Sequence, residues 1–454
     1  VTRVVTPGTV VDEALLEQRR DNLLVAIAPC GERTGLAWLD LGSGRLRVAE
    51  VDAGQLASEL ARLQPAETLL PEDIDWPESL TTGFRRRYAP WHFEPEAGRR
   101  ALLAQFAVRD LQGFGCEHLG PALGAAGALL QYLGDTQKST LPRLAGLALE
   151  QGEDSLHLDA ATRRHLEIEE HASGRQEHTL LGVLDDCRTA MGARLLRRWL
   201  ARPLRQRATL VDRQDAIETA RALGLAERLR EALAPIGDVE RILGRVALGS
   251  ARPRDLSGLR DALAACPVLA LIAAEGGPSV LAAHAAALTG LEAIAERLVA
   301  ALVAEPPIVM RDGGVIAPGY DEELDELRRL AQGADDFLTA LEEREREATG
   351  IANLRVAYNK VHGYYLEVTR SQLERVPARW SRRQTLKGAE RYITEELKHY
   401  EDQVLGSRER ALMRERALWE ELLSFLQAKL DPQRAAADAL AQLYVISNLA
   451  ALAD

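Results

Sequence analysis

The chain has 454 residues, of which 46% are hydrophobic, and its formal net charge is −12. This apolar content excludes an intrinsically disordered chain, and the length predicts two to four domains at roughly 100–200 residues each. The acidic total excludes a polycation, so any contact with nucleic acid must be local. Aromatic residues are scarce while Ala, Leu, Glu and Arg are abundant, which favours long helices over sheet sandwiches.

The segment 1–138 combines strand and helix patterns. Residues 35–41 and 45–51 alternate between apolar and polar types, and Gly42-Ser43-Gly44 between them predicts a hairpin. Further strands are predicted over 22–28 and 67–70, and helices over 54–63, 102–106 and 121–133. Strands followed by alternating helices and strands predict a small mixed sheet with helices packed on it.

From about Leu158 onward the sequence is helical, rich in Ala and Leu, and punctuated by prolines. The clearest helix is predicted from Asp321, a capping residue, to Thr349, where Gly350 ends it. Its apolar residues follow a heptad spacing, and they are Leu324, Leu327, Ala331, Ala334, Leu338 and Leu341. Ion pairs one turn apart are predicted on its polar face, namely Asp325 with Arg329 and Glu342 with Arg346.

A second long helix is predicted to begin at Thr394, with an apolar stripe that fits the first. The two helices are expected to run antiparallel, with residues 350–393 inserted between them. Alternating apolar residues on both sides of His362-Gly363 predict strands within the insertion.

Basic residues are concentrated in segment 350–400, which we call the basic insert. It contains ten Lys and Arg against five Asp and Glu, so its net charge is +5, whereas the remaining chain carries −17. A local excess of positive charge is the electrostatic footprint of phosphate binding. A solvated surface loop is the competing interpretation, and charge alone weighs the two about equally.

The run Arg382-Arg383-Gln384-Thr385-Leu386-Lys387 mixes guanidinium forks, an amide and a hydroxyl, all of which suit phosphate oxygens. No recognition helix or zinc finger is present, so holding the backbone fits better than reading bases. A helical structural or interaction protein, whose basic insert binds an acidic protein partner, is the alternative.

No catalytic or metal site is predicted. Asp40 at the hairpin resembles the first carboxylate of a nuclease of the RNase H type, but its partners cannot be placed, and a carboxylate that favours a turn is the stronger interpretation. His165, His171 and His178 lack metal-ligand spacing. The four cysteines, Cys30, Cys116, Cys187 and Cys266, are too far apart for metal pairs, which suits a cytoplasmic protein.

Neither a P-loop nor a G-x-S-x-G motif occurs. No run of about 18 apolar residues is evident, so no membrane partner is expected. The chain opens on Val1 without an initiator Met, and we interpret it as a fragment or a processed product.

Several motifs, spread in order over the chain, resemble the MutS family of bacterial DNA mismatch repair proteins. They are Val5-Thr6-Pro7-Gly8-Thr9, Asp159-Ala160-Ala161-Thr162-Arg163-Arg164-His165-Leu166-Glu167, Met191-Gly192-Ala193-Arg194-Leu195-Leu196-Arg197-Arg198-Trp199-Leu200, Arg311-Asp312-Gly313-Gly314-Val315-Ile316, His362-Gly363-Tyr364-Tyr365, Arg383-Gln384-Thr385-Leu386-Lys387 and Ala389-Glu390-Arg391-Tyr392.

The resemblance implies a multidomain α+β protein. Its expected parts are an RNase H-like α/β connector without nuclease activity over 1–138, an all-α core with long antiparallel lever helices over 139–349 and 404–454, and a β-rich clamp over 350–403. It also implies a homodimer that encloses duplex DNA, finds mismatches and recruits MutL through the connector. The mismatch-reading domain and the ATPase domain, with its ATP and Mg, are not in this sequence, so the chain itself is expected to lack enzyme activity and cofactors.

By motif, the resemblance implies that Arg383 and Lys387 contact the DNA backbone. Lys360, Arg379 and Arg382 are added as candidates from charge and neighbourhood alone. Gly388 stands where relatives often have Asn, so one hydrogen-bonding side chain of the family pattern is absent here.

Overall fold

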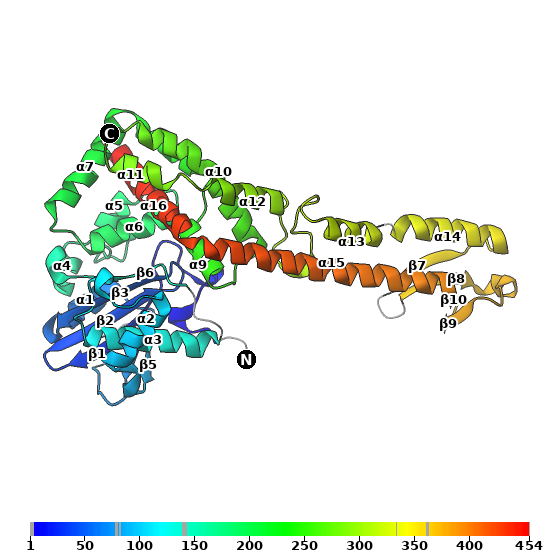
Figure 1. Ribbon diagram of the computed structural model, residues 1–454, viewed down its shortest axis with the longest axis horizontal. Helices are drawn as coiled ribbons and strands as arrows, with labels where there is room; N and C mark the ends of the chain where they lie inside the picture. Colours follow the sequence, from blue (N-terminus) through cyan, green and yellow to red (C-terminus); the bar gives the residue numbers. More distant parts are fainter. Residues whose placement is uncertain are drawn as a thin grey trace. The chain divides into compact units, whose positions relative to one another are not determined.

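The computed structural model describes residues 4–77, 80, 83–138, 143–332, 334–359 and 363–453. The chain divides into two compact units (Figure 1). Unit 1 comprises Val1–Leu298 with Leu423–Asp454, and unit 2 comprises Val299–Leu422.

A six-stranded mixed sheet forms the first part of unit 1. Its strands are β1 (Leu23–Cys30), β2 (Arg33–Asp40), β3 (Arg45–Asp52), β4 (Glu67–Pro71), β5 (Phe84–Tyr88) and β6 (Gly146–Leu149), in the order β5-β4-β1-β2-β3-β6. β2 runs antiparallel to β1 and β3, while β4 is parallel to β1 and β5 is parallel to β4. The first five strands therefore have the arrangement of the RNase H fold, as predicted. β5 and β6 were not predicted.

Helices cover both faces of this sheet. The faces are distinct because side chains alternate along each strand. The helix α1 (Leu56–Leu63) packs on one face against Val25, Ile27 and Trp38. The helices α2 (Pro95–Phe106) and α3 (Pro121–Gln137) enclose the larger core on the other face.

The second part of unit 1 is all helical. Its helices are α4 (Ala160–His165), α5 (Leu180–Leu184), α6 (Ala190–Ala201), α7 (Arg207–Ala222), α8 (Leu225–Leu233), α9 (Val239–Ala247), α10 (Pro253–Ala274), α11 (Val280–Ala287), the start of α12 (Glu292–Ala301) and α16 (Leu430–Leu452). The helix α16 runs among α6, α7, α8 and α11, and its residues Leu443 and Val445 are fully buried. It is therefore the central core element of this part.

Two of these helices, α10 and α16, are long and apolar enough to cross a membrane by length and composition alone. Half of the apolar window of α10 and two thirds of that of α16 are buried within the structure. The core helix of a protein without a membrane passes the same test, so the property is weak evidence for a membrane span.

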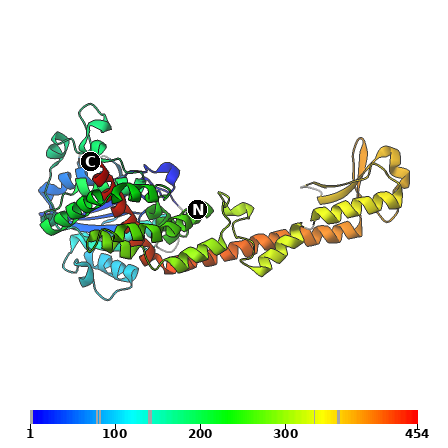
Figure 2. The same cartoon turned by 90° about the horizontal axis from the view of Figure 1, so that it is seen from above.

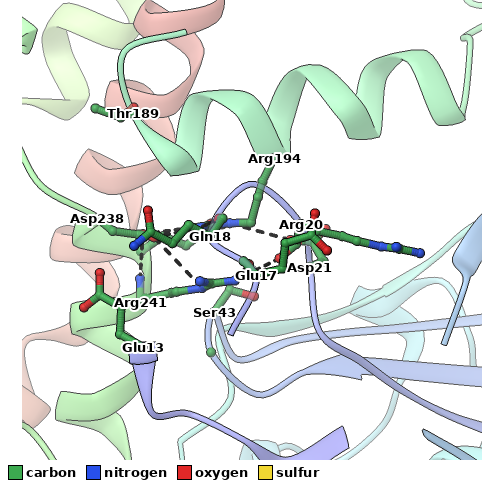
Figure 3. A network of polar contacts seen from close by, with 12 residues as sticks. Glu13, Glu17, Gln18, Arg20, Asp21, Ser43, Thr189, Arg194, Asp238 and Arg241 are labelled. Atoms are coloured by element: carbon green, nitrogen blue, oxygen red, sulfur yellow. Dashed lines mark hydrogen bonds and ion pairs between the residues drawn. The ribbon is translucent and has the colours of Figure 1, made fainter. Parts of the chain in front are cut away.

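A buried arginine joins the sheet part to the helical part (Figure 3). The side chain of Arg194, on α6, has no exposed surface, and its guanidinium makes two 2.7 Å hydrogen bonds to the carboxylate of Asp238 at the start of α9. It also donates to Glu240 at 2.7 Å and to the carbonyl oxygen of Gln18, just before β1, at 2.8 Å. Burial alone lowers the pKa of Arg194, but Glu240, Asp238 and Asp21 outweigh it and raise that pKa well above its usual value.

The helix α9 lies directly against the turn between β2 and β3. Arg241 donates to the backbone carbonyl oxygens of Glu17 and Arg20, both at 2.8 Å. A Cβ atom added at Gly244 would lie 1.8 Å from the carbonyl oxygen of Gly42. Only a glycine allows the two backbones to approach this closely.

Unit 2 contains the long helices that the heptad pattern predicted, and Figures 1 and 2 show them side by side. They are α13 (Glu322–Gln332), α14 (Ala334–Thr349) and α15 (Glu395–Ala428), whose residues up to Leu422 belong to this unit. Residue 333, between α13 and α14, lies outside the described residues, so the single helix predicted over 321–349 is described as two.

Contacts along these helices confirm the antiparallel arrangement within unit 2. Asp321 pairs with Arg414 at 2.6 Å, Phe337 stacks on Tyr400 with ring centroids 4.0 Å apart, and Arg344 pairs with Glu396. From one pair to the next, the first residue lies later in the sequence and the second lies earlier, which is the pattern of two antiparallel helices.

The predicted cap at Asp321, the predicted helix start at Thr394 and one of the two predicted ion pairs are confirmed. Asp321 accepts a hydrogen bond from the Leu324 N–H at 2.9 Å, and Thr394 accepts one from the Leu397 N–H at 3.0 Å. Glu342 pairs with Arg346 at 2.5 Å. The pair of Asp325 with Arg329 was wrong. Arg329 binds Glu326 instead, and the Asp325 carboxylate accepts a hydrogen bond from the Gly319 N–H.

A buried glutamate on α15 fixes the loop that precedes α13. The carboxylate of Glu415, 3% exposed, accepts hydrogen bonds from the backbone N–H groups of Gly314, Val315 and Ile316 at 2.6–3.1 Å. It also pairs with Arg328 at 2.9 Å. One carboxylate thus satisfies three backbone donors that the loop geometry leaves without a ladder partner.

We predict that Gly244→Ala destabilises unit 1, because the new methyl group would meet the Gly42 carbonyl and separate α9 from the sheet. The expected loss is about 3 kcal/mol or more, the upper end for overpacking, since backbone cannot move aside as a side chain can. Chemical unfolding followed by circular dichroism measures this loss of stability.

Gly134→Ala in α3 is the control, because no atom lies within 4 Å of its added Cβ, and that change should raise stability by up to about 1 kcal/mol. Equal losses in both variants would contradict the close-approach argument.

Candidate nucleic-acid interface

The basic insert folds into a four-stranded antiparallel sheet. Its strands are β7 (Arg355–Asn359), β8 (Gly363–Thr369), β9 (Ser381–Thr385) and β10 (Ala389–Ile393), in the order β7-β8-β10-β9. One face packs on the helices, where Leu366 and Val368 of β8 meet Leu341 of α14 and Leu397 of α15 in one buried cluster. The strand-rich insertion predicted from alternating residues is confirmed.

The edge strand β9 contains a bulge at Arg383. In the pairing with β10, Arg391 faces Gln384 and Tyr392 faces Arg382, which leaves Arg383 as the extra residue. A bulge redirects the side chain of its extra residue. Arg383 accordingly donates from the same nitrogen to the Glu401 carboxylate of α15 at 3.0 Å and to the Tyr364 carbonyl at 3.1 Å.

Glu401 also lies against Gly363, the first residue of β8. Gly363 has a φ of +67°, and a Cβ added there would lie 1.7 Å from a Glu401 carboxylate oxygen. Only glycine adopts this backbone region without strain while leaving room for the carboxylate. The Gly363-Glu401-Arg383 contact therefore attaches both β8 and β9 to α15.

Two of the predicted contact residues are engaged by helix carboxylates. Arg383 has a 31% exposed side chain and pairs with Glu401, which is itself buried. Arg379 pairs at 2.7 Å with Glu345 of α14, whose side chain is 8% exposed. These two arginines anchor the sheet to its helices, and an incoming phosphate would compete with those carboxylates.

Two others are directed to solvent. Lys387, in the turn between β9 and β10, is exposed and has no ion pair or hydrogen bond among the described residues. The side chain of Arg382 is 64% exposed and lies 3.8 Å from Glu390. Glu390 is also occupied, because it accepts a 2.6 Å hydrogen bond from the Tyr392 hydroxyl. The fifth predicted residue, Lys360, lies outside the described residues.

Two further cations are exposed to solvent without an ion pair, and sequence reasoning did not select them. Arg355 and Lys398 have no ion pair or side-chain hydrogen bond within the described parts of the chain. Arg355 lies opposite Glu367 in the β7–β8 register, but Arg391 already holds that carboxylate at 2.9 Å. A signal was present in the sequence, because the alternation of Leu354, Val356 and Tyr358 places Arg355 on the solvent face.

Arg370 and Lys387 belong to the same end of the sheet. Arg370 follows β8 directly, and its guanidinium contacts the Leu386 carbonyl at 3.4 Å, next to Lys387. The registers also place the start of β7, with Arg355, near this end. Arg355, Arg370 and Lys387 thus lie near one end of the sheet, and none of them has a carboxylate within ion-pair distance in the described structure.

Asp40, the residue behind the nuclease alternative, is buried in unit 1. It is 3% exposed, and its Oδ1 accepts a 3.1 Å hydrogen bond from the Gly42 N–H while Oδ2 has no partner among the described residues. Burial raises the pKa of Asp40 to about 7, and the charges of Asp21 and Glu240 add to the effect. Over the described residues, no group of three or more His, Cys, Asp or Glu side chains is placed to hold a metal ion. No observation favours a nuclease.

The molecule thus combines an RNase H-like α/β sheet part, an all-α part, and a basic sheet carried between two long helical segments. Comparison with known families agrees with this architecture. The model of MutS domain II matches residues 22–145, and the model of MutS domain III matches residues 161–450. The second match alone covers more than half of the chain, so the chain belongs to the MutS family. This membership associates it, in general terms, with DNA mismatch repair and DNA binding.

We predict that Asp40→Asn stabilises unit 1 above neutral pH. The pKa of Asp40 in the folded protein is about 7, above the ordinary value near 3.9. The ionised carboxylate therefore destabilises the fold fully above pH 7, and this destabilisation disappears as the pH falls toward 4. The variant should gain roughly 1–3 kcal/mol at pH 8, the cost of a buried unsatisfied group, and less at pH 5.5. Urea unfolding at both pH values measures this gain. Asp75→Asn, at a fully exposed side chain, is the control, and an unchanged midpoint of Asp40→Asn at pH 8 would contradict the prediction.

Proposed function

We propose that the basic insert of unit 2 holds the phosphate backbone of duplex DNA without reading its sequence, as the clamp of a mismatch repair protein. The observation that supports this proposal is the group of exposed cations without carboxylate partners around the β9–β10 turn, Lys387 above all. Such groups exchange condensed counterions of the DNA for protein charge, which gives affinity independent of sequence.

The distribution of partners separates binding from anchoring. Arg383 and Arg379 are held by Glu401 and Glu345, so they orient the sheet on α14 and α15. Lys387, Arg382 and Arg355 have their charged groups in water, where a phosphate can replace solvent at low cost. The edge strand β9 adds one unpaired row of backbone N–H groups, which are also phosphate ligands.

Reversal of charge at both Arg383 and Lys387 to Glu tests the interface as a whole. We expect weaker duplex binding by a similar factor for matched and mismatched DNA, and a salt slope flattened by roughly one to two units at ~0.9 per phosphate. Fluorescence anisotropy across a salt series measures both quantities. An unchanged slope would remove these residues from the interface.

Single neutral variants separate the two roles. Lys387→Gln should flatten the slope by about 0.9 unit and leave the unfolding midpoint unchanged. Arg383→Gln should lower the unfolding midpoint of unit 2 and change the slope less, because its charge is already matched by Glu401. Lys138→Gln, at an exposed lysine of unit 1, is the matched control. If no variant changes DNA binding while binding to an acidic protein falls, the alternative of an acidic protein partner would replace this proposal.

We propose further that the sheet part of unit 1 recruits MutL, and that the parent protein acts as a homodimer in the cytoplasm. Exposed aromatic side chains support a protein contact on this part, since Trp91 is 66% exposed and Phe84 50%. Large exposed aromatic residues are frequent energetic centres of protein interfaces.

Trp91→Ala should weaken MutL binding by at least about tenfold, since truncation of an interface tryptophan commonly costs 2 kcal/mol or more. Surface plasmon resonance with immobilised MutL measures this effect, and the salt slope of DNA binding should not change. Leu271→Ala, at an equally exposed apolar residue of α10, should bind MutL as the unmodified chain does. Equal affinities of the Trp91 variant and the unmodified chain would place the MutL contact elsewhere.

A further inference from the structure

A cavity of about 330 Å³ lies between the sheet part and the helical part of unit 1. Residues of β2, β3 and α1 line one side, and residues of α6, α7 and α16 line the other. Its wall contains eight arginines, namely Arg20, Arg45, Arg47, Arg62, Arg197, Arg198, Arg202 and Arg213, and five carboxylates, namely Asp21, Asp40, Glu150, Glu169 and Asp438. The wall therefore has a formal excess of three positive charges in a chain whose total is −12.

Five of the eight arginines are neutralised in place. Arg45 and Arg198 pair with Asp21 and Glu240, Arg62 and Arg202 pair with Glu150, and Arg197 pairs with Glu169. These pairs fix the wall and account for most of its carboxylates. The five arginines share Asp21, Glu150 and Glu169 of the wall, with Glu240 outside it, so Asp40 and Asp438 are the wall carboxylates that remain beside the other three arginines.

The three remaining guanidinium groups are half-buried, and in the described structure none has a carboxylate within ion-pair distance. Among the described residues, the Arg20 side chain donates only to the Gln64 side-chain oxygen. Arg213 stacks on the Trp199 ring at 3.7 Å, and burial lowers its pKa. The side chain of Arg47 has neither a hydrogen bond nor an ion pair among the described residues, although its charge acts to lower the pKa of Asp438. A half-buried cation without a partner is costly, and a bound anion removes that cost.

We propose that this cavity binds a small phosphate-bearing anion, held by Arg20, Arg47 and Arg213. Guanidinium forks match phosphate oxygens in pairs, which makes arginine the preferred residue for such ligands. The volume admits a small ligand and excludes a duplex. Because both parts of unit 1 supply the wall, an occupant would also stabilise the contact between them.

Isothermal titration calorimetry of the whole chain with inorganic phosphate, pyrophosphate and ATP, in a phosphate-free buffer, tests this inference. We expect saturable binding at one site and a higher thermal unfolding midpoint with ligand. Arg47→Gln should weaken binding by about tenfold, or about 1.4 kcal/mol, with Arg47→Lys intermediate. Arg228→Gln, at a surface arginine paired with Glu275, is the matched control and should bind as the unmodified chain does.

Asp438→Asn distinguishes an anion site from a structural role of the wall. Asp438 lines the cavity, and its replacement by Asn removes a negative charge there. Phosphate should therefore bind more tightly, whereas damage to a purely structural wall would weaken binding. Equal affinity for pyrophosphate and ATP would identify the phosphate groups as the recognised part, whereas tighter binding of ATP would identify a nucleotide. No heat with any of the three ligands, or equal binding by Arg47→Gln, would overturn the inference. Duplex binding should be the same in Arg47→Gln, so the outcome is independent of the proposed DNA interface.

Discussion

Compensation of buried arginine charge is the constraint on which unit 1 depends. Arg194 has no exposed side-chain surface, and removing such a charge from water costs several kcal/mol unless partners surround it. Asp238 and Glu240 supply the charge, and the Gln18 carbonyl supplies a further acceptor. Because these partners come from α9 and from the segment before β1, the arginine is stable only when the sheet part and the helical part are in contact. One residue thus makes the folding of two sequence-distant parts interdependent.

In unit 2, the presence or absence of a carboxylate partner separates cations that stabilise the structure from cations that are available to a ligand. Arg383 and Arg379 have buried carboxylates as partners, and Glu401 in turn requires the glycine at 363. Lys387 and Arg355 have no carboxylate partner among the described residues. A positive charge in the sequence is therefore not enough to assign a binding residue, because helices many positions away contribute the carboxylates that neutralise Arg383 and Arg379. The family match supports DNA binding by the chain in general, and the partner distribution selects which side chains to test.

Local patterns predicted much of the fold. The hairpin of β2 and β3, the Asp321 cap, the helix start at Thr394 and the strands of the basic insert depend on neighbours in sequence, and all are present. β5 and β6 were missed because their strand character comes from pairing with β4 and β3 rather than from alternation. The wrong pair of Asp325 with Arg329 has a similar cause, since the Gly319 N–H competes for the Asp325 carboxylate. Which arginine is matched to which acid is a tertiary property, and sequence spacing does not contain it.

In the arginine-rich cavity of unit 1, the compensation of arginine charge by carboxylates is incomplete. Five arginines of the wall have ion pairs, whereas Arg20, Arg47 and Arg213 have no carboxylate within ion-pair distance in the described structure. Stability does not explain this arrangement, because an apolar residue at position 47 would be cheaper to bury than a guanidinium without an ion pair. Departures from local optimality are expected where a site serves a ligand rather than the fold. The buried Asp40, with its raised pKa and its unpartnered oxygen in the same wall, is a second such departure. A bound anion would offset the charges of the three arginines and would keep Asp40 protonated, because two negative charges repel.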